Sequence, residues 1–242
     1  MTPTERPPLA SAGGAVSALL DVYLTNASMY IRTHLQYRIG GLMRAIAFLV
    51  EPVVYLAIWT AIAQQRGGEV AGLPAGVITA YYVVWTLVRT TTAAFTPQGF
   101  EAAVLFVVFR PELHPGVWQV VVFVLAVCGA YVVRSMLFWI LGMVNFWTTR
   151  TSALFELYMV CELLLAGRLV PMDFMPTQVN AIADWLPFYW TFGFPIEVLV
   201  LDMDGTAMVR GLAAQVLWIA ACAALVRLVW RRAVRRYTAV GN

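Results

Sequence analysis

The sequence predicts an all-α protein that spans a membrane several times, and three observations support this fold class. Of the 242 residues, 61% are hydrophobic and only 12% are charged, which is about half the charged fraction of an ordinary soluble domain. Several apolar stretches are long enough to cross a bilayer core of about 30 Å as helices. Arginines gather at both ends of the apolar region. This composition excludes a soluble enzyme.

The placement of these arginines predicts the orientation in the membrane. Four of them lie before or at the start of the first apolar span, and five lie at the end of the last: Arg6, Arg32, Arg38 and Arg44, then Arg227, Arg231, Arg232, Arg235 and Arg236. Basic clusters next to spans mark the cytoplasmic side. We therefore expect both termini in the cytoplasm, with the basic tail at 231–242 beside the inner membrane surface rather than on nucleic acid.

The N-terminal half begins with a segment too polar to span. Residues 15–40 mix apolar positions with several charged and polar ones, which is typical of an amphipathic helix lying on the membrane surface. We therefore expect 1–40 to form a cytoplasmic N-terminus with such a helix. The first span is predicted at 41–63, and a polar, Gly-rich turn follows it. The second span is predicted at 77–95 and ends where Pro97 and Gly99 break the helix.

The C-terminal half holds three further apolar spans, predicted at 117–147, 152–170 and 211–230. Between the last two lies an aromatic segment broken by prolines, which indicates short helices dipping into the membrane interface. Its carboxylates are typical of solvated loops, although they are also placed to guide a substrate that leaves outward. They are Asp173, Asp184, Glu197, Asp202 and Asp204.

These five spans conflict with the charge pattern, because an odd number puts the termini on opposite sides. The conflict disappears if the apolar run 102–109, about 12 Å long as a helix, is the remnant of a sixth span. We therefore expect a cytoplasmic loop to be missing near Glu101 and Ala102. Residues 41–230 are predicted to form one transmembrane domain. The alternative is a re-entrant half-helix with atypical charge placement.

The residue inventory excludes several chemistries. All 16 basic residues are arginines, so the chain has no lysine for a nucleotide-binding P-loop or for a Schiff base. His34 and His114 are far apart, and the three cysteines lie singly in apolar runs. No spacing suits a zinc site. We expect no catalytic residues, no metal site and no cofactor in this chain.

Charged residues inside the predicted spans are the candidates for function. They are Glu51, Arg89, Arg134, Glu156 and Glu162. Each costs about 2.5–3.5 kcal/mol at the centre of a bilayer, so each has to face protein or water. One interpretation is that they line a translocation path. The other is that they form ion pairs between helices, for example Arg134 with Glu162. Pairing is favoured for Arg134, the two interpretations are balanced for Glu51, and Glu156 lies close enough to the inner surface to reach headgroups.

The aromatic residues allow two interpretations as well. Tyr81, Tyr82, Trp85, Trp139 and Trp147 are predicted to form belts at the membrane interfaces. The alternative is that they line a cavity for an apolar or amphipathic substrate.

Short motifs in residues 146–199 and the basic C-terminal segment resemble the permeases of type-2 ABC exporters. The motifs are Trp147-Thr148-Thr149-Arg150, Ala166-Gly167-Arg168-Leu169-Val170-Pro171, Leu186-Pro187-Phe188 and Phe194-Pro195-Ile196-Glu197. The resemblance continues in Arg231–Asn242 and, more weakly, in His34–Ala45 and Thr86–Pro97.

The resemblance implies six spans, a second permease chain, identical or related, and two separate ATP-binding subunits that carry ATP and Mg²⁺. It implies re-entrant extracellular helices before the last span, marked here by Gly167, Pro171, Pro187, Pro195 and Glu197. It also implies a cytoplasmic coupling loop between spans two and three, where this chain departs from the family pattern. A bacterial cytoplasmic membrane is the expected location.

We therefore interpret the chain as the non-catalytic permease subunit of an ATP-driven exporter of small amphipathic, lipid or drug-like molecules. The alternative is a stand-alone secondary transporter or channel that uses Glu51 and Arg134, which predicts an inverted repeat that the two halves do not show. An intramembrane enzyme would need a nucleophile with a base or a cluster of metal ligands, and this sequence shows neither pattern.

Overall fold

The computed structural model describes residues 25, 28, 29, 32, 38–70, 73–92, 100–111, 113–148, 150–168 and 172–235. Among these, helices dominate, with one short hairpin of β1 (Glu69–Val70) and β2 (Leu73–Pro74). The longer helices are α2 (Arg38–Gln65), α3 (Ala75–Thr92), α4 (Phe100–Phe109), α5 (Val117–Met143), α6 (Thr151–Leu165) and α10 (Gly205–Val234). The short helices are η1 (Val144–Phe146), η2 (Met172–Phe174), α7 (Thr177–Trp185), α8 (Pro187–Thr191) and α9 (Gly193–Val200).

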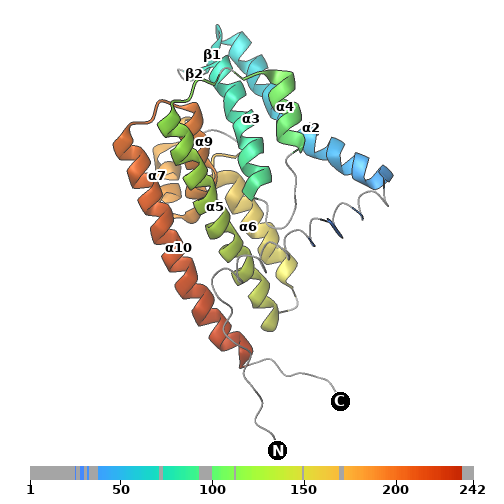
Figure 1. Cartoon of the computed structure of the whole chain (residues 1–242), viewed down its shortest axis with the longest axis vertical. Helices are drawn as coiled ribbons and strands as arrows, with labels where there is room; N and C mark the ends of the chain where they lie inside the picture. Colours follow the sequence, from blue (N-terminus) through green and yellow to red (C-terminus); the bar gives the residue numbers. More distant parts are fainter. Residues whose placement is uncertain are drawn as a thin grey trace, which may run out of the picture.

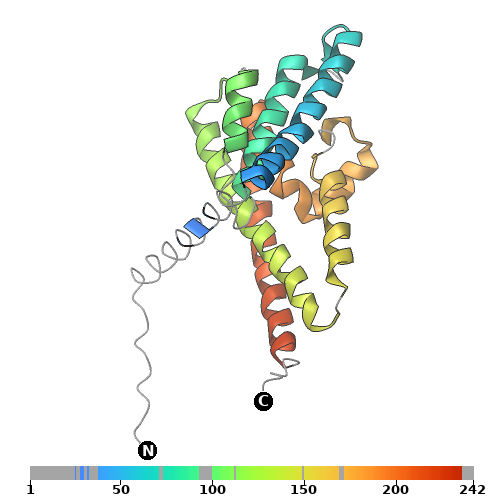
Figure 2. The same cartoon turned by 90° about the vertical axis from the view of Figure 1, so that its right-hand side faces the viewer.

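The helices form two groups joined by the short helices. Helices α2, α3 and α4 lie together at the end that carries the hairpin, and α5 packs along α10 (Figure 1). Helix α9 contacts both α3 and α5. Helix α6 stands apart from α2 in the second view, and the segment from η2 to α9 lies above it (Figure 2). Of the predicted short helices before the last span, α8 and α9 pack between the two groups, whereas α7 is largely exposed, with Trp185 84% exposed.

The larger core lies between α2, α3 and α9. Tyr82, Trp85 and Phe192 are fully buried there, together with Leu56 and Ile78. The belt predicted for Tyr81, Tyr82 and Trp85 is therefore wrong, since these rings fill the interior of the subunit. Trp139 and Trp147 do remain exposed, at 55% and 38%. Tight packing of large rings stabilises helix contacts where lipid supplies no hydrophobic driving force.

The second core joins α5 and α10 through α8 and α9. Val122, Trp190, Phe194 and Met208 pack there. Gln215 of α10 crosses this core and donates to the carbonyl oxygens of Ala126 and Trp190, at 2.9 and 2.8 Å. Interhelical bonds of this kind contribute about 0.6 kcal/mol each, and up to about 1.7, in membrane proteins.

Two segments of the described chain are long and apolar enough to cross a membrane, Val117–Phe146 and Gly205–Val234. Much of their surface is exposed and apolar, as it is for Val124, Leu125, Val216 and Leu217. At 1.5 Å per residue, 30 residues extend about 45 Å. Both segments therefore exceed a hydrocarbon core of about 30 Å, and α10 carries Arg231 and Arg232 in its last turn.

Helix α4 is the short apolar run whose role the sequence left open. It has 10 residues, ends where Arg110 adopts φ 42° before Pro111, and lies beside α3 at the hairpin end (Figure 1). A residue in the left-handed region followed by proline terminates a helix. Glu101 and Ala102 both lie within α4, and the preceding residues 93–99 are outside the described part, so the missing loop near 101/102 stays a prediction.

Several predicted boundaries differ from the observed ones. Helix α2 begins at Arg38, inside the segment 15–40 predicted to lie on the surface, most of which is outside the described residues. The predicted span at 152–170 extends five residues beyond the helix, because α6 stops at Leu165. The last helix begins at Gly205 rather than at 211, since Asp204 caps it.

Candidate functional site

A cluster of five charged side chains occupies the middle of the fold, and we call it the charge cluster. It consists of Glu51, Arg89, Arg134, Glu162 and Arg168. The five residues come from α2, α3, α5, α6 and the turn after α6. One connected set of ion pairs therefore links four long helices.

The α5–α6 side of the cluster is closed to solvent. Arg134 donates from Nε and Nη2 to the two carboxylate oxygens of Glu162, at 3.0 and 3.2 Å. The exposed fractions of these side chains are 7% and 0%. Tyr158 donates to Glu162 at 2.9 Å, and Arg134 Nη1 donates to Thr92 at 3.2 Å. Two parallel hydrogen bonds from one guanidinium are the strongest form of an arginine–carboxylate pair. The Arg134–Glu162 pair is the one that the sequence analysis suggested as the alternative to substrate contact.

The α2–α3 side of the cluster is more open. Arg89 donates to Glu51 Oε2 at 2.5 Å, and the Glu51 side chain is 32% exposed. Pro52 follows Glu51 within α2 and removes one backbone donor from that helix. Glu51 is thus the member of the cluster that a solute reaches most easily.

Arg168 joins the two sides. Its Nη2 donates to Glu51 Oε1 at 3.1 Å, and its Nη1 lies 3.6 Å from Glu162 Oε2. Its Nε is buried and has no hydrogen-bond partner among the described residues. One guanidinium therefore bridges two carboxylates and keeps a spare donor.

The turn that holds Arg168 is fixed by its neighbours. Gly167 adopts φ +71°, and its carbonyl oxygen accepts a hydrogen bond from Tyr81 at 2.8 Å. A Cβ atom at this position would lie 2.7 Å from the Tyr81 oxygen. Glycine is therefore required here for its conformation and for the close approach.

Aromatic rings surround the guanidinium groups. Arg89 and Arg168 lie over Trp85, at 4.9 and 5.5 Å from the ring centroid. Arg134 lies 4.8 Å from the centroid of Phe192. Such cation–π contacts contribute about 2 kcal/mol when they are shielded from water. The rings lower the cost of keeping arginines away from solvent.

The cluster carries an excess positive charge, since three arginines face two glutamates. Removing one partner of a buried ion pair costs about 3–5 kcal/mol, because it leaves the other charge uncompensated. The arrangement therefore holds the helices in one defined relation, and any rearrangement has to exchange one set of ion pairs for another.

The other predicted site residues lie near the short helices. Pro171 is outside the described residues, Pro187 starts α8, and Pro195 lies in the first turn of α9. Glu197 is buried, 8% exposed, and accepts a 2.5 Å hydrogen bond from Tyr189. The interpretation of Glu197 as a solvated loop carboxylate is therefore wrong, because it lies inside the core that joins α9 to its neighbours.

Two further charges complete the comparison with the sequence. Arg168 was not singled out, because it lies in a turn outside the apolar runs that mark costly charges. Its place directly after Gly167 in an otherwise apolar motif was the available signal. Glu156 is exposed and forms no ion pair within the described residues.

Comparison with protein families supplies the identity of the fold. The family described as ABC-2 family transporter protein matches residues 80–241, which include Arg89, Arg134, Glu162 and Arg168. The chain belongs to the ABC-2 transporter family. No curated protein and no solved structure matches it.

Membership makes this chain a permease, the multi-pass membrane component of an ABC transporter. ABC-2 permeases are transport components and are generally non-catalytic. Within the described residues, no group of three or more His, Cys, Asp or Glu residues is placed to hold a metal ion. The charge cluster therefore lies in a permease, and membership of this family implies association with ATP-binding subunits.

Proposed function

We propose that this permease is the membrane subunit of an ATP-driven exporter, in which it forms the translocation path with a second permease chain. Two separate ATP-binding subunits supply ATP hydrolysis. The family match over residues 80–241 is the observation that supports this proposal. Its substrate is a small amphipathic, lipid or drug-like molecule, and its location is a bacterial cytoplasmic membrane with both termini inside.

The charge cluster is the element that responds to ATP binding in this proposal. It ties α2 and α3 to α5 and α6 through ion pairs, so movement of one helix group changes the partners of Arg168. The Arg168–Glu162 contact, at 3.6 Å, is longer than the Arg134–Glu162 contact and is the first to break. The spare Arg168 Nε provides a donor for the second arrangement.

Glu51 faces the translocation path in this proposal. Its side chain is the most exposed of those that form the ion pairs. Exposure of a charged side chain in the middle of a helix is expensive in lipid and is cheaper beside a water-filled cavity. The second permease chain completes that cavity on the exposed side of α2.

The first experiment purifies the native complex in mild detergent and identifies each co-eluting chain by mass spectrometry. Recovery of an ATP-binding subunit, with or without a second permease, supports the proposal. A chain that elutes alone at 26.8 kDa and transports without ATP contradicts it and favours the stand-alone transporter that uses Glu51 and Arg134.

A second experiment tests the role of the cluster in the reconstituted complex. Arg168→Gln removes the bridge between Glu51 and Glu162, so we expect ATP-driven transport to fall at least tenfold while the ATP-binding subunits still co-purify. Arg66→Gln is the matched control, because Arg66 is exposed at the hairpin end and outside the cluster. Equal transport by the two variants contradicts a role for Arg168.

A further inference from the structure

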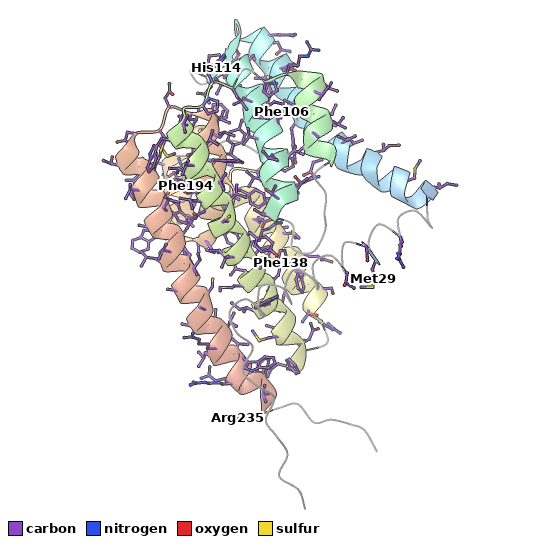
Figure 3. All side chains as sticks on the ribbon, in the orientation of Figure 1. Met29, Phe106, His114, Phe138, Phe194 and Arg235 are labelled. Carbon is purple, nitrogen blue, oxygen red and sulfur yellow. The ribbon has the colours of Figure 1, made fainter. Side chains whose placement is uncertain are left out.

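A groove between α5 and α10 lies toward the C-terminal end of α10, and the ring centroid of its lining residue Phe138 is 5.6 Å from Arg134 Cζ of the charge cluster. Its volume is about 510 Å³, within the range that holds small-molecule ligands. It is lined by Phe138, Trp139, Gly142, Met143, Phe146, Val226 and Trp230. Figure 3 labels Phe138 on α5 and Arg235 at the end of α10, which bound this region.

The groove is open and apolar. A Cβ atom added to Gly142 would meet nothing within 4 Å, so the floor of the groove is not occupied by the protein's own side chains. Trp139 and Trp230 are each 55% exposed at its rim. Two exposed tryptophans at the end of a spanning helix pair are typical of the membrane interface.

Two arginines of α10 lie close in sequence to Trp230, although neither is among the residues that line the groove. Arg227 precedes Trp230 by three positions, so the two side chains lie on the same flank of α10. Arg231 follows Arg227 by one turn, and both are exposed. Neither forms an ion pair with any residue that the structure describes. Among the described residues, these two positive charges therefore have no counterion.

We propose that this groove binds an anionic phospholipid, with one acyl chain along the aromatic lining and the phosphate on Arg227 and Arg231. Arginine forks match phosphate oxygens in geometry and charge. Basic pockets between membrane helices on the cytoplasmic side are suited to such headgroups, and the arginine clusters predict that this end faces the cytoplasm. The lipid stabilises the α5–α10 pair and is distinct from the transported substrate.

A second copy of the chain is a poorer occupant. A two-fold contact brings the same patch of both copies together, so each Arg227 would approach its counterpart. Like charges across an interface are unfavourable, and the aromatic lining supplies no carboxylate to offset them. A phospholipid brings the missing negative charge with its apolar chain.

The test is native mass spectrometry of the full chain, with any subunits that co-purify, after exposure to equal amounts of phosphatidylglycerol and phosphatidylcholine. We expect the wild type to retain phosphatidylglycerol in preference. Arg227→Gln lowers this retention about fivefold, the equivalent of about 1 kcal/mol per basic residue near a membrane surface. Gly142→Leu fills the groove and removes the tightly bound lipid.

Arg232→Gln is the matched control. Arg232 lies five positions after Arg227, roughly 140° around the helix, and is also exposed. It removes the same charge from the same helix end and is expected to leave retention unchanged. Melting temperatures of the three variants within a few degrees of the wild type show that each is folded.

Three results overturn the proposal. They are equal retention of the two lipids by the wild type, equal loss in Arg227→Gln and Arg232→Gln, and unchanged retention in Gly142→Leu. A dimer of this chain that Gly142→Leu dissociates assigns the groove to a second copy instead. The measurement does not depend on recovery of the ATP-binding subunits, so its failure and the failure of the exporter proposal are separate results.

Discussion

Glu162 is the residue on which the charge cluster depends most. Its two oxygens accept two hydrogen bonds from Arg134 and one from Tyr158, and Arg168 lies close to the second oxygen. The side chain is completely buried. Because this single carboxylate balances two neighbouring arginines, its loss leaves an excess of positive charge that water does not reach.

We therefore expect Glu162→Gln to lower the free energy of unfolding by about 3–5 kcal/mol, measured by thermal unfolding in detergent. Glu156→Gln, an exposed change on the same helix, is expected to stay within about 0.5 kcal/mol of the wild type. The double variant Arg134→Gln/Glu162→Gln is expected to be less destabilised than the sum of its single variants, since it removes both ends of one pair. Equal melting of the Glu162 and Glu156 variants contradicts this account.

Gly167 controls the cluster without carrying a charge. Gly167→Ala is expected to destabilise the fold by more than about 1 kcal/mol, because alanine is strained at positive φ and its Cβ meets the Tyr81 oxygen. Gly76→Ala is the control, since a Cβ there meets nothing within 4 Å. Unfolding measurements that show no difference between the two variants contradict the assigned role of the turn.

At the scale of elements, apolar length predicted some helices well and others poorly. The start of α5 at Val117 agrees with the predicted span, because Pro115 and Gly116 end the preceding turn and an unbroken apolar run follows. The end of α6 was predicted five residues late, since residues up to 170 are apolar apart from Arg168. Apolarity does not reveal that Gly167 turns left-handed there.

Four of the five members of the charge cluster were predictable from the sequence, but of their connections the sequence suggested only the Arg134–Glu162 pair. The cost of charge in lipid identified Glu51, Arg89, Arg134 and Glu162 individually. Their partners lie 28, 38 and 117 positions apart along the chain, so the pairing depends on how the helices pack. Arg168 lies in a turn, where charge is ordinary, and only the fold shows that this turn is folded inward.

Helix α10 begins at a side-chain cap that also makes it sensitive to acid. The Asp204 carboxylate accepts from Thr206 and from the Ala207 backbone N–H at 3.0 Å, and these bonds, with Thr206 first, lower the pKa of Asp204 below its usual value of 3.8. A lowered pKa stabilises the folded state above the unfolded value, and this contribution is lost as the pH falls through the folded pKa.

We therefore expect the Ala207 amide to exchange hydrogen slowly near neutral pH and to lose protection, relative to amides deeper in α10, below about pH 4. Asp204→Ala removes the protection at every pH, whereas Asp204→Asn keeps a capping oxygen and removes the acid dependence. Asp202→Ala is the control, because Asp202 caps no helix. Hydrogen exchange with mass spectrometry measures these differences, and acid-dependent protection in Asp204→Asn contradicts the assignment.

At the scale of the whole molecule, the long helices alternate in direction. Helix α2 leads to the hairpin, α3 returns from it, and α4 leads back to the same end before α5 descends (Figure 1). Helix α6 then rises and α10 descends to the arginine-rich end (Figure 2). The prediction of six spans assigns the third pass to α4, although this helix is only about 15 Å long, and it requires the two termini to lie on the same side of the membrane.

The orientation is tested by cysteine labelling with a membrane-impermeant maleimide in whole cells, on a background with Cys128, Cys161 and Cys222 replaced by serine. Gln65→Cys and His114→Cys are expected to react in intact cells, because both positions are exposed at the hairpin end and Figure 3 labels His114 there. Ser152→Cys, exposed at the start of α6, is expected to react only after permeabilisation.

Labelling of Gln65→Cys without His114→Cys contradicts α4 as a third pass and favours a re-entrant helix. Labelling of Ser152→Cys alone in intact cells reverses the orientation, and with it the side on which ATP-binding subunits dock.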